Sequence, residues 1–320
     1  MKNYSSKFKN TIILLIIGFA LFPAITFAAI LYLEPSSGEY QPGDTFIVEM
    51  KIDTEGECIN TIEANLSFSQ DILKAVDFSQ GQSIIILWVK SPEINQESGL
   101  ISFAGGIPGG YCGRIPGEPG VTNLLGKIIF RIPGMIVGEL MEGSAEVKIL
   151  DTSEVLLNDG LGTRAKLATQ EAAFEILSKL EPSKDEWFQE LKEDTIPPEP
   201  FEIEIHQESA IFEGKYFITF STTDKQTGLD YYEVKEGERD WKEMGSPYLL
   251  EDQSLTSIIK VRAVDKAGNE RIVEIPATHP PLPFYKTLAF WIIIVNVSMV
   301  IIIFLWIIIN RIKKKKIESE

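Results

Sequence analysis

The sequence has little of the chemistry that catalysis and transition-metal binding require. Among its 320 residues there are two histidines, His206 and His279, and two cysteines. A zinc site needs several Cys or His ligands at short spacing, so this composition excludes one. The Gly-x-Ser-x-Gly, His-Glu-x-x-His and phosphate-loop motifs do not occur. A glycosidase carboxylate pair stays open, because such residues meet only in the fold. We therefore predict a binding or structural protein, not an enzyme.

Positive charge is also scarce. The chain has 30 Lys and Arg against 46 Asp and Glu, a net charge of −16. Without the three lysines near the N-terminus, the five cations of the C-terminal tail and the two glutamates there, 22 basic and 44 acidic residues remain, near −22. Such a surface repels nucleic acid and attracts divalent cations. We predict no nucleic-acid partner.

Uncharged runs near both ends predict the topology. Residues 1–28 combine lysines, an apolar stretch and small residues at the end, which is typical of a cleaved secretory signal. A retained N-terminal anchor is the alternative. Residues 288–309 carry no charge, and at about 1.5 Å per residue they are long enough to cross a hydrocarbon core of about 30 Å. The basic tail 310–320 favours the cytoplasmic side. We predict a single-pass membrane protein with its N-terminus outside and its C-terminus cytoplasmic.

Two polar residues, Asn296 and Ser298, lie inside this predicted span. One interpretation is that they hydrogen-bond a partner helix. The other is that a long apolar span tolerates one or two such groups without any partner.

The two cysteines, Cys58 and Cys112, both fall in the predicted exterior part. An even count in an oxidising compartment predicts one disulfide. Closing a loop of roughly 55 residues would stabilise the fold by about 4 kcal/mol in the chain-entropy model. The alternative is a pair of free, buried thiols.

The exterior part reads as two β regions, so we predict an all-β fold with one C-terminal transmembrane helix. In residues 29–180, apolar residues alternate as in half-buried strands, and Gly and Pro cluster between them, which predicts a β-sandwich. The alternating positions are Phe46 to Ile52, Ile62 to Phe68 and Ala145 to Ile149. Two denser runs, Ile84–Val89 and Ile128–Ile132, indicate strands covered on both faces. Residues 165–178 fit either a helix or a closing strand.

Residues 201–277 show the same strand signals over a shorter length, for example at Tyr216, Ile218 and Phe220. A charged segment, 181–200, ends in Ile-Pro-Pro-Glu-Pro and is predicted as a linker. A proline-rich stalk, 278–287, precedes the membrane.

Five segments of the first region, taken in order, resemble a cohesin-type module. They are Tyr40 to Phe46, Asn65 to Leu73, Ser98 to Phe103, Leu125 to Phe130 and Asn158 to Thr163. The resemblance implies a jelly-roll-like sandwich of the kind also found in carbohydrate-binding modules, and it implies dockerin binding, as in the best-studied members. The two cysteines and the Gly/Pro-rich loop 105–120 depart from those members, and no partner-contacting residue is carried over.

The second region resembles bacterial immunoglobulin-like or fibronectin type III-like surface repeats. The residues that carry this likeness are Asp194 to Pro200, Asp224 to Tyr232 and Ala263 to Asn269. The resemblance implies a small immunoglobulin-like sandwich that acts as a spacer or an adhesion module.

The loop 105–120 holds the candidate ligand-binding residues Tyr111 and Arg114. An exposed tyrosine ring can stack on a sugar face, and an arginine can supply polar contacts. Long loops without secondary structure are often functional. The alternative is an irregular connection that the disulfide at Cys112 holds in place. Trp88 is interpreted as a core residue.

Four oxygen-bearing side chains are the candidate metal ligands: Asp224, Asp230, Asp265 and Asn269. If the fold brings them together they suit Ca²⁺, which takes six to eight oxygen ligands in flexible geometry. The alternative is ordinary turn chemistry, with a hairpin between Asp265 and Asn269. No other cofactor is predicted.

These observations lead to one functional hypothesis and one alternative. We expect a membrane-anchored extracellular binding or adhesion protein whose cohesin-like module binds a carbohydrate or a surface protein, with a dockerin-like partner included. The alternative is a structural component of the cell envelope that has no soluble ligand.

Overall fold

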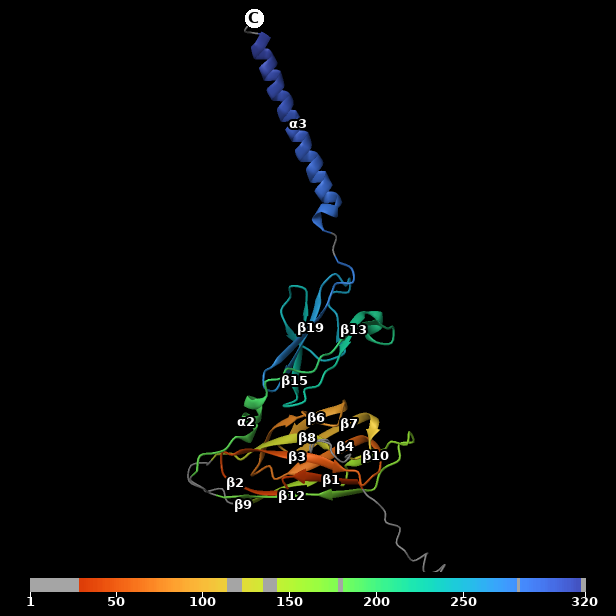
Figure 1. The fold of residues 1–320 in the computed structure, drawn as a ribbon, viewed down its shortest axis with the longest axis vertical. Coiled ribbons are helices and arrows are strands. Elements are labelled where there is room, and N and C mark those ends of the chain that lie inside the picture. Colours follow the sequence, from red (N-terminus) through yellow and green to blue (C-terminus); the bar gives the residue numbers. More distant parts are fainter. Residues whose placement is uncertain (1–28, 114–122, 135–142, 178–180, 281–282, 318–320) are drawn as a thin grey trace, which may run out of the picture. The chain divides into compact units, whose positions relative to one another are not determined.

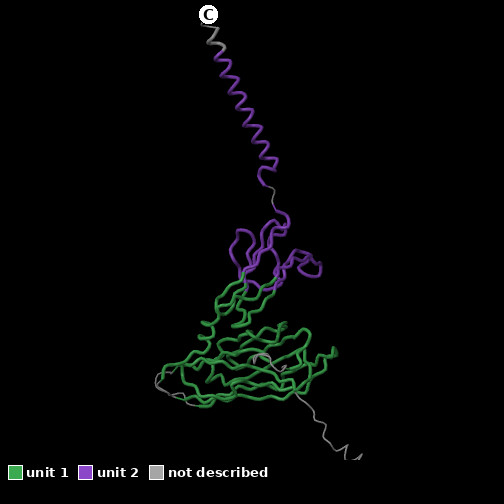
Figure 2. The backbone as a smooth tube through the Cα atoms, viewed as in Figure 1, with its two compact units in different colours: residues 1–201, 221–231, 263–271 green, residues 202–220, 232–262, 272–320 purple. Residues whose placement is uncertain are grey.

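The computed structural model describes residues 29–113, 123–134, 143–177, 181–280 and 283–317 (Figure 1). The chain divides into two compact units (Figure 2). Unit 1 contains the residues up to 201 together with 221–231 and 263–271, and unit 2 contains 202–220, 232–262 and 272 onward. The predicted signal segment 1–28 lies outside the described residues.

Unit 1 is a β-sandwich, as predicted. One sheet has the order β11-β1-β3-β8-β5, and the other has the order β2-β12-β9-β4-β7-β6, with β10 paired to β4. The strands are β1 Ala29–Glu34, β2 Ser37–Tyr40, β3 Thr45–Asp53, β4 Ile59–Phe68, β5 Lys74–Ser79, β6 Leu87–Asn95, β7 Leu100–Tyr111, β8 Leu124–Arg131, β9 Gly143–Ile149, β10 Glu154–Leu157, β11 Leu167–Gln170 and β12 Ala172–Ile176. The ambiguous stretch 165–178 therefore supplies two strands, and β12 closes the second sheet between β2 and β9.

The core of unit 1 forms where the inward faces of both sheets meet. Because successive side chains of a strand point to opposite faces, every second residue of β3 and β4 is buried, including all the alternating positions predicted there. Phe46 lies at the centre of an aromatic group, with ring centroids 5.1 Å from Phe174 and 5.9 Å from Phe130. Tyr40 stacks on Phe46 at 3.9 Å.

The strand β8 is buried on both faces, as the run Ile128–Ile132 predicted. Helix α2, Glu186–Glu193, lies inside the segment predicted as a linker, and it contacts β3 and β8 of the first sheet. The helix begins at Asp185, whose carboxylate accepts from the backbone N–H of Phe188 at 2.9 Å. Lys127 of β8 is buried and reaches Glu190 of α2 at 2.7 Å. This segment is therefore packed on the sandwich.

The prediction of a strand covered on both faces at Ile84–Val89 is wrong. The strand β6 begins only at Leu87, and Ile86, Leu87 and Val89 are 60%, 59% and 75% exposed. The physical reason is that β6 is an edge strand that pairs with β7 alone, through an irregular register. Trp88 does face the core, 5.7 Å from Phe103, as interpreted from the sequence.

Unit 2 is also built of β-strands. One sheet has the order β13-β14-β17 and the other β16-β15-β18-β19. The strands are β13 Ile203–Gln207, β14 Tyr216–Phe220, β15 Leu229–Glu236, β16 Lys242–Glu243, β17 Tyr248–Leu249, β18 Ile259–Asp265 and β19 Glu270–Ile275, with short 3₁₀ helices η1 Phe212–Gly214 and η2 Phe284–Lys286. By the division above, parts of β15, β18 and β19 belong to unit 1. The hairpin predicted between Asp265 and Asn269 is present, closed by the Asp265 N–H to Asn269 carbonyl bond.

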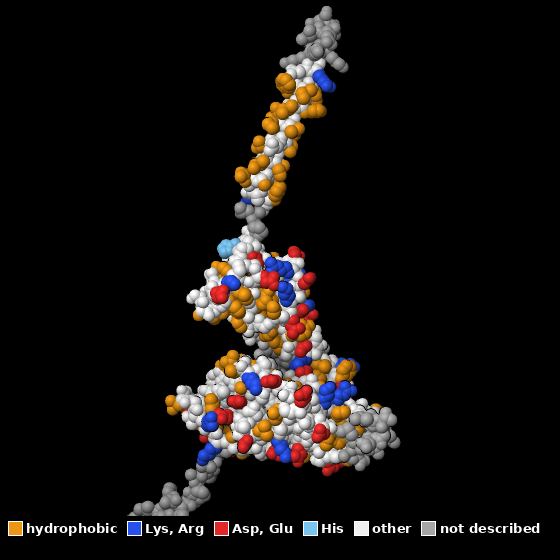
Figure 3. All heavy atoms as spheres, turned by 180° about the vertical axis from the view of Figure 1, so that it is seen from behind, with side chains coloured by type: hydrophobic (Ala, Val, Ile, Leu, Met, Phe, Trp, Pro, Cys, Tyr) orange, Lys and Arg blue, Asp and Glu red, His pale blue; other side chains and the backbone are white. Residues whose placement is uncertain are grey.

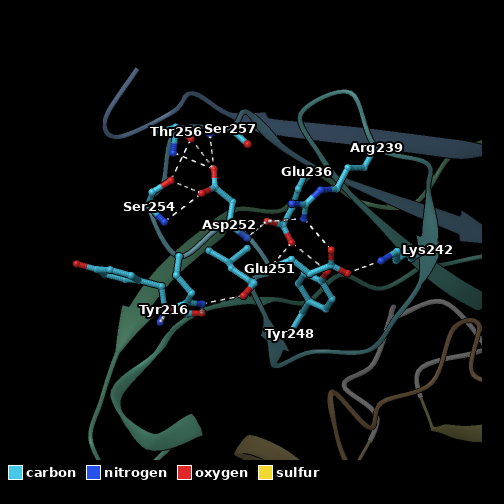
Figure 4. Close-up of polar contacts among 12 residues, drawn as sticks. Tyr216, Glu236, Arg239, Lys242, Tyr248, Glu251, Asp252, Ser254, Thr256 and Ser257 are labelled. Carbon is cyan, nitrogen blue, oxygen red and sulfur yellow. Dashed lines mark hydrogen bonds and ion pairs between the residues drawn. The ribbon is translucent and has the colours of Figure 1, made fainter. Parts of the chain in front are cut away.

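A buried carboxylate organises one end of unit 2 (Figure 4). Glu236 accepts from the Tyr248 hydroxyl at 3.0 Å and from the backbone N–H groups of Glu251 and Asp252 at 2.8 and 2.7 Å. Burial, helped by the hydrogen bond to Glu236, raises the pKa of Tyr248. The Ser254 hydroxyl donates a hydrogen bond to the carboxylate of Asp252, and this bond lowers the pKa of Asp252. The bonds drawn here are internal, so we interpret the network as structural.

Helix α3, Leu288–Ile317, is the long C-terminal helix. Its residues 288–312 are long and apolar enough to cross a membrane, with a mean hydropathy of 3.1 in the most apolar window. Figure 3 shows apolar side chains along its length. The helix contains the predicted span 288–309 and continues into the tail as far as Ile317.

Candidate functional site

The outer face of the second sheet in unit 1 carries aligned rows of side chains, with small residues along β7. Strands β9, β4, β7 and β6 lie side by side, and their pairing aligns four rows of outward residues. The rows are Lys148–Ser67–Leu100–Asn95, Asn65–Ser102–Glu93, Glu63–Ala104–Lys90 and Thr61–Gly106–Leu87. We call this surface the β4-β7-β6 face.

Strand β7 contributes small outward residues to this face. Its inward residues, Ile101, Phe103 and Ile107, fill the core, while its outward residues between Leu100 and Pro108 are Ser, Ala and Gly. Lys90 of the neighbouring strand β6 donates its Nζ to Ser102 at 2.7 Å.

Two exposed leucines lie at opposite ends of this face, one on β7 and one on β6. Leu100 is exposed in the first row, and Leu87 is exposed in the last row beside Ile86 and Val89. The rows between the two leucines carry the charged residues Glu63, Lys90 and Glu93. A surface that combines exposed apolar residues with polar ones suits a protein partner.

Of the two residues predicted for sugar binding, the structure describes Tyr111. Tyr111 ends β7, pairs with Ile59 and packs partly buried against the hydrophobic core. Arg114 lies outside the described residues. The disulfide Cys58–Cys112 is present and joins the start of β4 to the end of β7. The Tyr111 ring is thus part of the packing beside the disulfide. The predicted loop 105–120 is not irregular throughout, because residues 105–111 belong to β7.

Three carboxylates converge in unit 1. Asp194, Asp224 and Asp265 each place an oxygen within 4.8 Å of the others, and all three side chains are buried. Asp194 follows the last residue of α2, Asp224 lies before β15, and Asp265 ends β18. The sequence predicted the nearness of Asp224 and Asp265 but missed Asp194. Its position at the start of the Asp194–Pro200 motif was the available signal.

Turns hold each of these carboxylates in place. Asp224 accepts from the N–H groups of Gln226 and Gly228 at 3.0 and 2.8 Å, and Asp194 accepts from the Thr227 hydroxyl at 2.6 Å. Burial raises the pKa of Asp224 and of Asp265, and repulsion from the neighbouring carboxylates acts in the same direction. Bringing three such groups together disfavours their charged forms unless a cation joins them.

The other two predicted metal ligands behave differently. Asn269 reaches the cluster, but it donates its Nδ2 to Asp265 at 2.9 Å and to the Asp194 carbonyl at 3.2 Å. Asp230 is not among the converging residues; its carboxylate is half exposed and lies 3.7 Å from Lys266. Lys266 also binds Asp77 of β5 at 2.8 Å. The structure therefore brings together Asp224, Asp265 and Asn269, adds Asp194, and leaves Asp230 apart.

Comparison with known proteins finds likeness at the level of structure. No family model matches the chain, and no curated protein matches it in sequence. A type I cohesin–dockerin complex from Clostridium thermocellum is 13% identical and covers 49% of this chain and 98% of its own, with a TM-score of 0.38. The seventh ScaB type I cohesin from Pseudobacteroides cellulosolvens is 15% identical over 49% of this chain and 98% of its own, with a TM-score of 0.37. At these identities the likeness concerns the fold alone.

Proposed function

We propose that this chain is a membrane-anchored protein-binding module whose β4-β7-β6 face receives a protein partner. The observation that supports this proposal is the row of small outward residues on β7, with the exposed leucines Leu100 and Leu87 at the two ends of the face. Small side chains let a partner approach the sheet closely, and the leucines supply apolar area to be buried at about 25 cal/mol per Å².

The face alone is smaller than a standard protein interface. Four rows two residues apart span about 20 Å, and four strands span about 14 Å across, which gives about 280 Å². A partner that buries the roughly 800 Å² of a standard interface would therefore also contact the exposed edge at Ile86 and Val89. The face carries both acidic and basic groups, so its partner would need charges of both signs.

The anchor and the spacer complete the proposal. Helix α3 holds the module at the membrane, with the N-terminal part outside because the cations follow the span. Unit 2 acts as an immunoglobulin-like spacer. A structural role in the envelope is the alternative, and it predicts no saturable soluble partner.

The direct test is a photo-crosslinking amino acid placed at Ser102, in the middle of the face, in the full chain in its native cells. We expect one defined crosslinked protein. The matched control carries the crosslinker at Leu161, which is 84% exposed on the turn after β10, and it should not give that product. Equal crosslinking at both positions, or none at Ser102, would contradict the proposal.

Binding measurements define the partner class. Dockerins are the first proteins to titrate, because cohesin–dockerin complexes are among the structural matches. Leu87→Arg should abolish binding to any partner found, whereas Leu161→Arg should leave it unchanged. A glycan array with the Tyr111→Ala/Arg114→Ala variant tests the carbohydrate alternative: loss of a sugar signal in that variant would support it.

We also propose that Asp194, Asp224 and Asp265 hold Ca²⁺. The support is that three buried carboxylates place oxygens within 4.8 Å of one another, so that one cation could touch all three. Carboxylate oxygens are the ligands that Ca²⁺ prefers. The alternative is that the cluster only stabilises turns, with Asn269 as a donor to its carboxylates.

Thermal unfolding in Ca²⁺ and in EDTA separates these two roles. Binding stabilises the folded state by about 2.7 kcal/mol when free Ca²⁺ is 100 times its dissociation constant. Asp224→Asn should remove the Ca²⁺-dependent shift in melting temperature. Asp230→Asn is the matched control and should keep the shift, since Asp230 lies outside the cluster. Identical melting of the unmodified chain in Ca²⁺ and EDTA would leave only the turn role.

A further inference from the structure

Helix α3 carries an amide that its own chain satisfies only in part. Asn296 donates one N–H to the carbonyl of Ile292 at 2.7 Å. Its second N–H and its Oδ1 have no bond among the described residues, and the side chain is exposed on the helix surface. The neighbouring Ser298 differs, because its single hydroxyl donor is used on the carbonyl of Ile294 at 2.7 Å.

The depth of Asn296 makes this shortfall costly. It lies eight residues inside the span that begins at Leu288, about 12 Å along the helix axis. At that depth no water is present to accept the second N–H or to donate to Oδ1, and an unmatched polar group in hydrocarbon is unfavourable.

Asn296 marks one face of the helix. In a left-handed helix pair one face returns every three to four residues, so Asn296 shares its face with Met299, Ile303, Trp306 and Asn310. The described chain buries none of the most apolar window, so this face is free to pack.

We propose that the chain forms a parallel dimer through α3, in which Asn296 of one copy hydrogen-bonds Asn296 of the other. A second copy is the occupant that fits, because an amide is both donor and acceptor and so complements an identical amide. Two identical chains inserted in the same direction place Asn296 at the same depth. The proposal rests on α3 crossing the membrane.

The test is energy transfer between donor- and acceptor-labelled full-length chains in phosphatidylcholine vesicles. We expect self-association that weakens about tenfold or more in Asn296→Leu, because the reciprocal hydrogen bonds are lost. Asn296→Gln keeps an amide and should retain most of the association. Ser298→Ala, the matched control, should change it by less than about twofold, since that hydroxyl is bonded within its own helix.

Three outcomes would overturn the dimer: no concentration-dependent energy transfer in the unmodified chain, equal transfer in Asn296→Leu, or equal weakening in Ser298→Ala. A carbonate wash of the same vesicles distinguishes failure of the dimer from failure of the membrane span. A chain that stays with the vesicles but is monomeric refutes the dimer alone, whereas a chain released by the wash refutes the span itself.

Discussion

An ion pair between α2 and the sandwich has two unequally buried partners. The Lys127 side chain is 5% exposed and that of Glu190 is 36% exposed, with 2.7 Å between Nζ and Oε2. Breaking a fully buried pair by removing one partner costs about 3–5 kcal/mol, whereas exposed pairs contribute about 0–1 kcal/mol. Glu190→Gln leaves the buried ammonium of Lys127 without its counter-charge. Because the pair is buried at one end and partly exposed at the other, we expect the free energy of unfolding to fall by about 2 kcal/mol, between these two limits.

The reverse change should cost less. Lys127→Met removes the buried charge and leaves only a carboxylate that water reaches, so we expect a loss below about 1 kcal/mol. The double variant should match Lys127→Met alone. Urea unfolding followed by tryptophan fluorescence measures all three, since Trp187 of α2 is buried. Glu146→Gln, which breaks the exposed pair with Lys148, is the control and should cost about 0.5 kcal/mol or less. Equal losses for Glu190→Gln and Lys127→Met would refute the reasoning.

Two other predictions follow from unit 1. The Cys58→Ser/Cys112→Ser variant should lose about 4 kcal/mol of unfolding free energy in urea, the value expected for the chain entropy of a loop of this length; an unchanged midpoint would show that the disulfide does not constrain the unfolded chain. Burial, with the nearby charges of Glu186 and Asp44, raises the pKa of Tyr40 to about 12. The unfolded chain therefore loses this proton first, so the contribution of Tyr40 is complete below about pH 10 and is lost as the pH rises towards 12. Absorbance titration should show a tyrosine ionising near 12 that is missing in Tyr40→Phe, and a difference titrating near 10 would contradict it.

Local patterns were enough to predict the strands that pack into the core. Period-two alternation at Phe46 to Ile52 and at Ile62 to Phe68 indicates which face is buried, because a strand has no other way to hide alternate apolar residues. The same reasoning failed at Ile84–Val89. An apolar run shows that its residues are apolar but not where its strand lies in the sheet, and here the strand is at an edge.

The candidate sites depend more strongly on tertiary structure. The β4-β7-β6 face exists because the register of three strands aligns their outward residues into rows. A shift of one residue would turn each of these side chains to the other face. In the same way, Asp194 joins Asp224 and Asp265 only because the segment that follows α2 returns to two distant turns.

The sequence by itself therefore determined the long apolar helix, the all-β class and the residues that fill the core, because each of these depends on composition or on local periodicity. The structure decided that the cysteines pair, that α2 packs on the sandwich, and which carboxylates meet. Those features depend on contacts between residues tens of positions apart, which only the folded chain brings together.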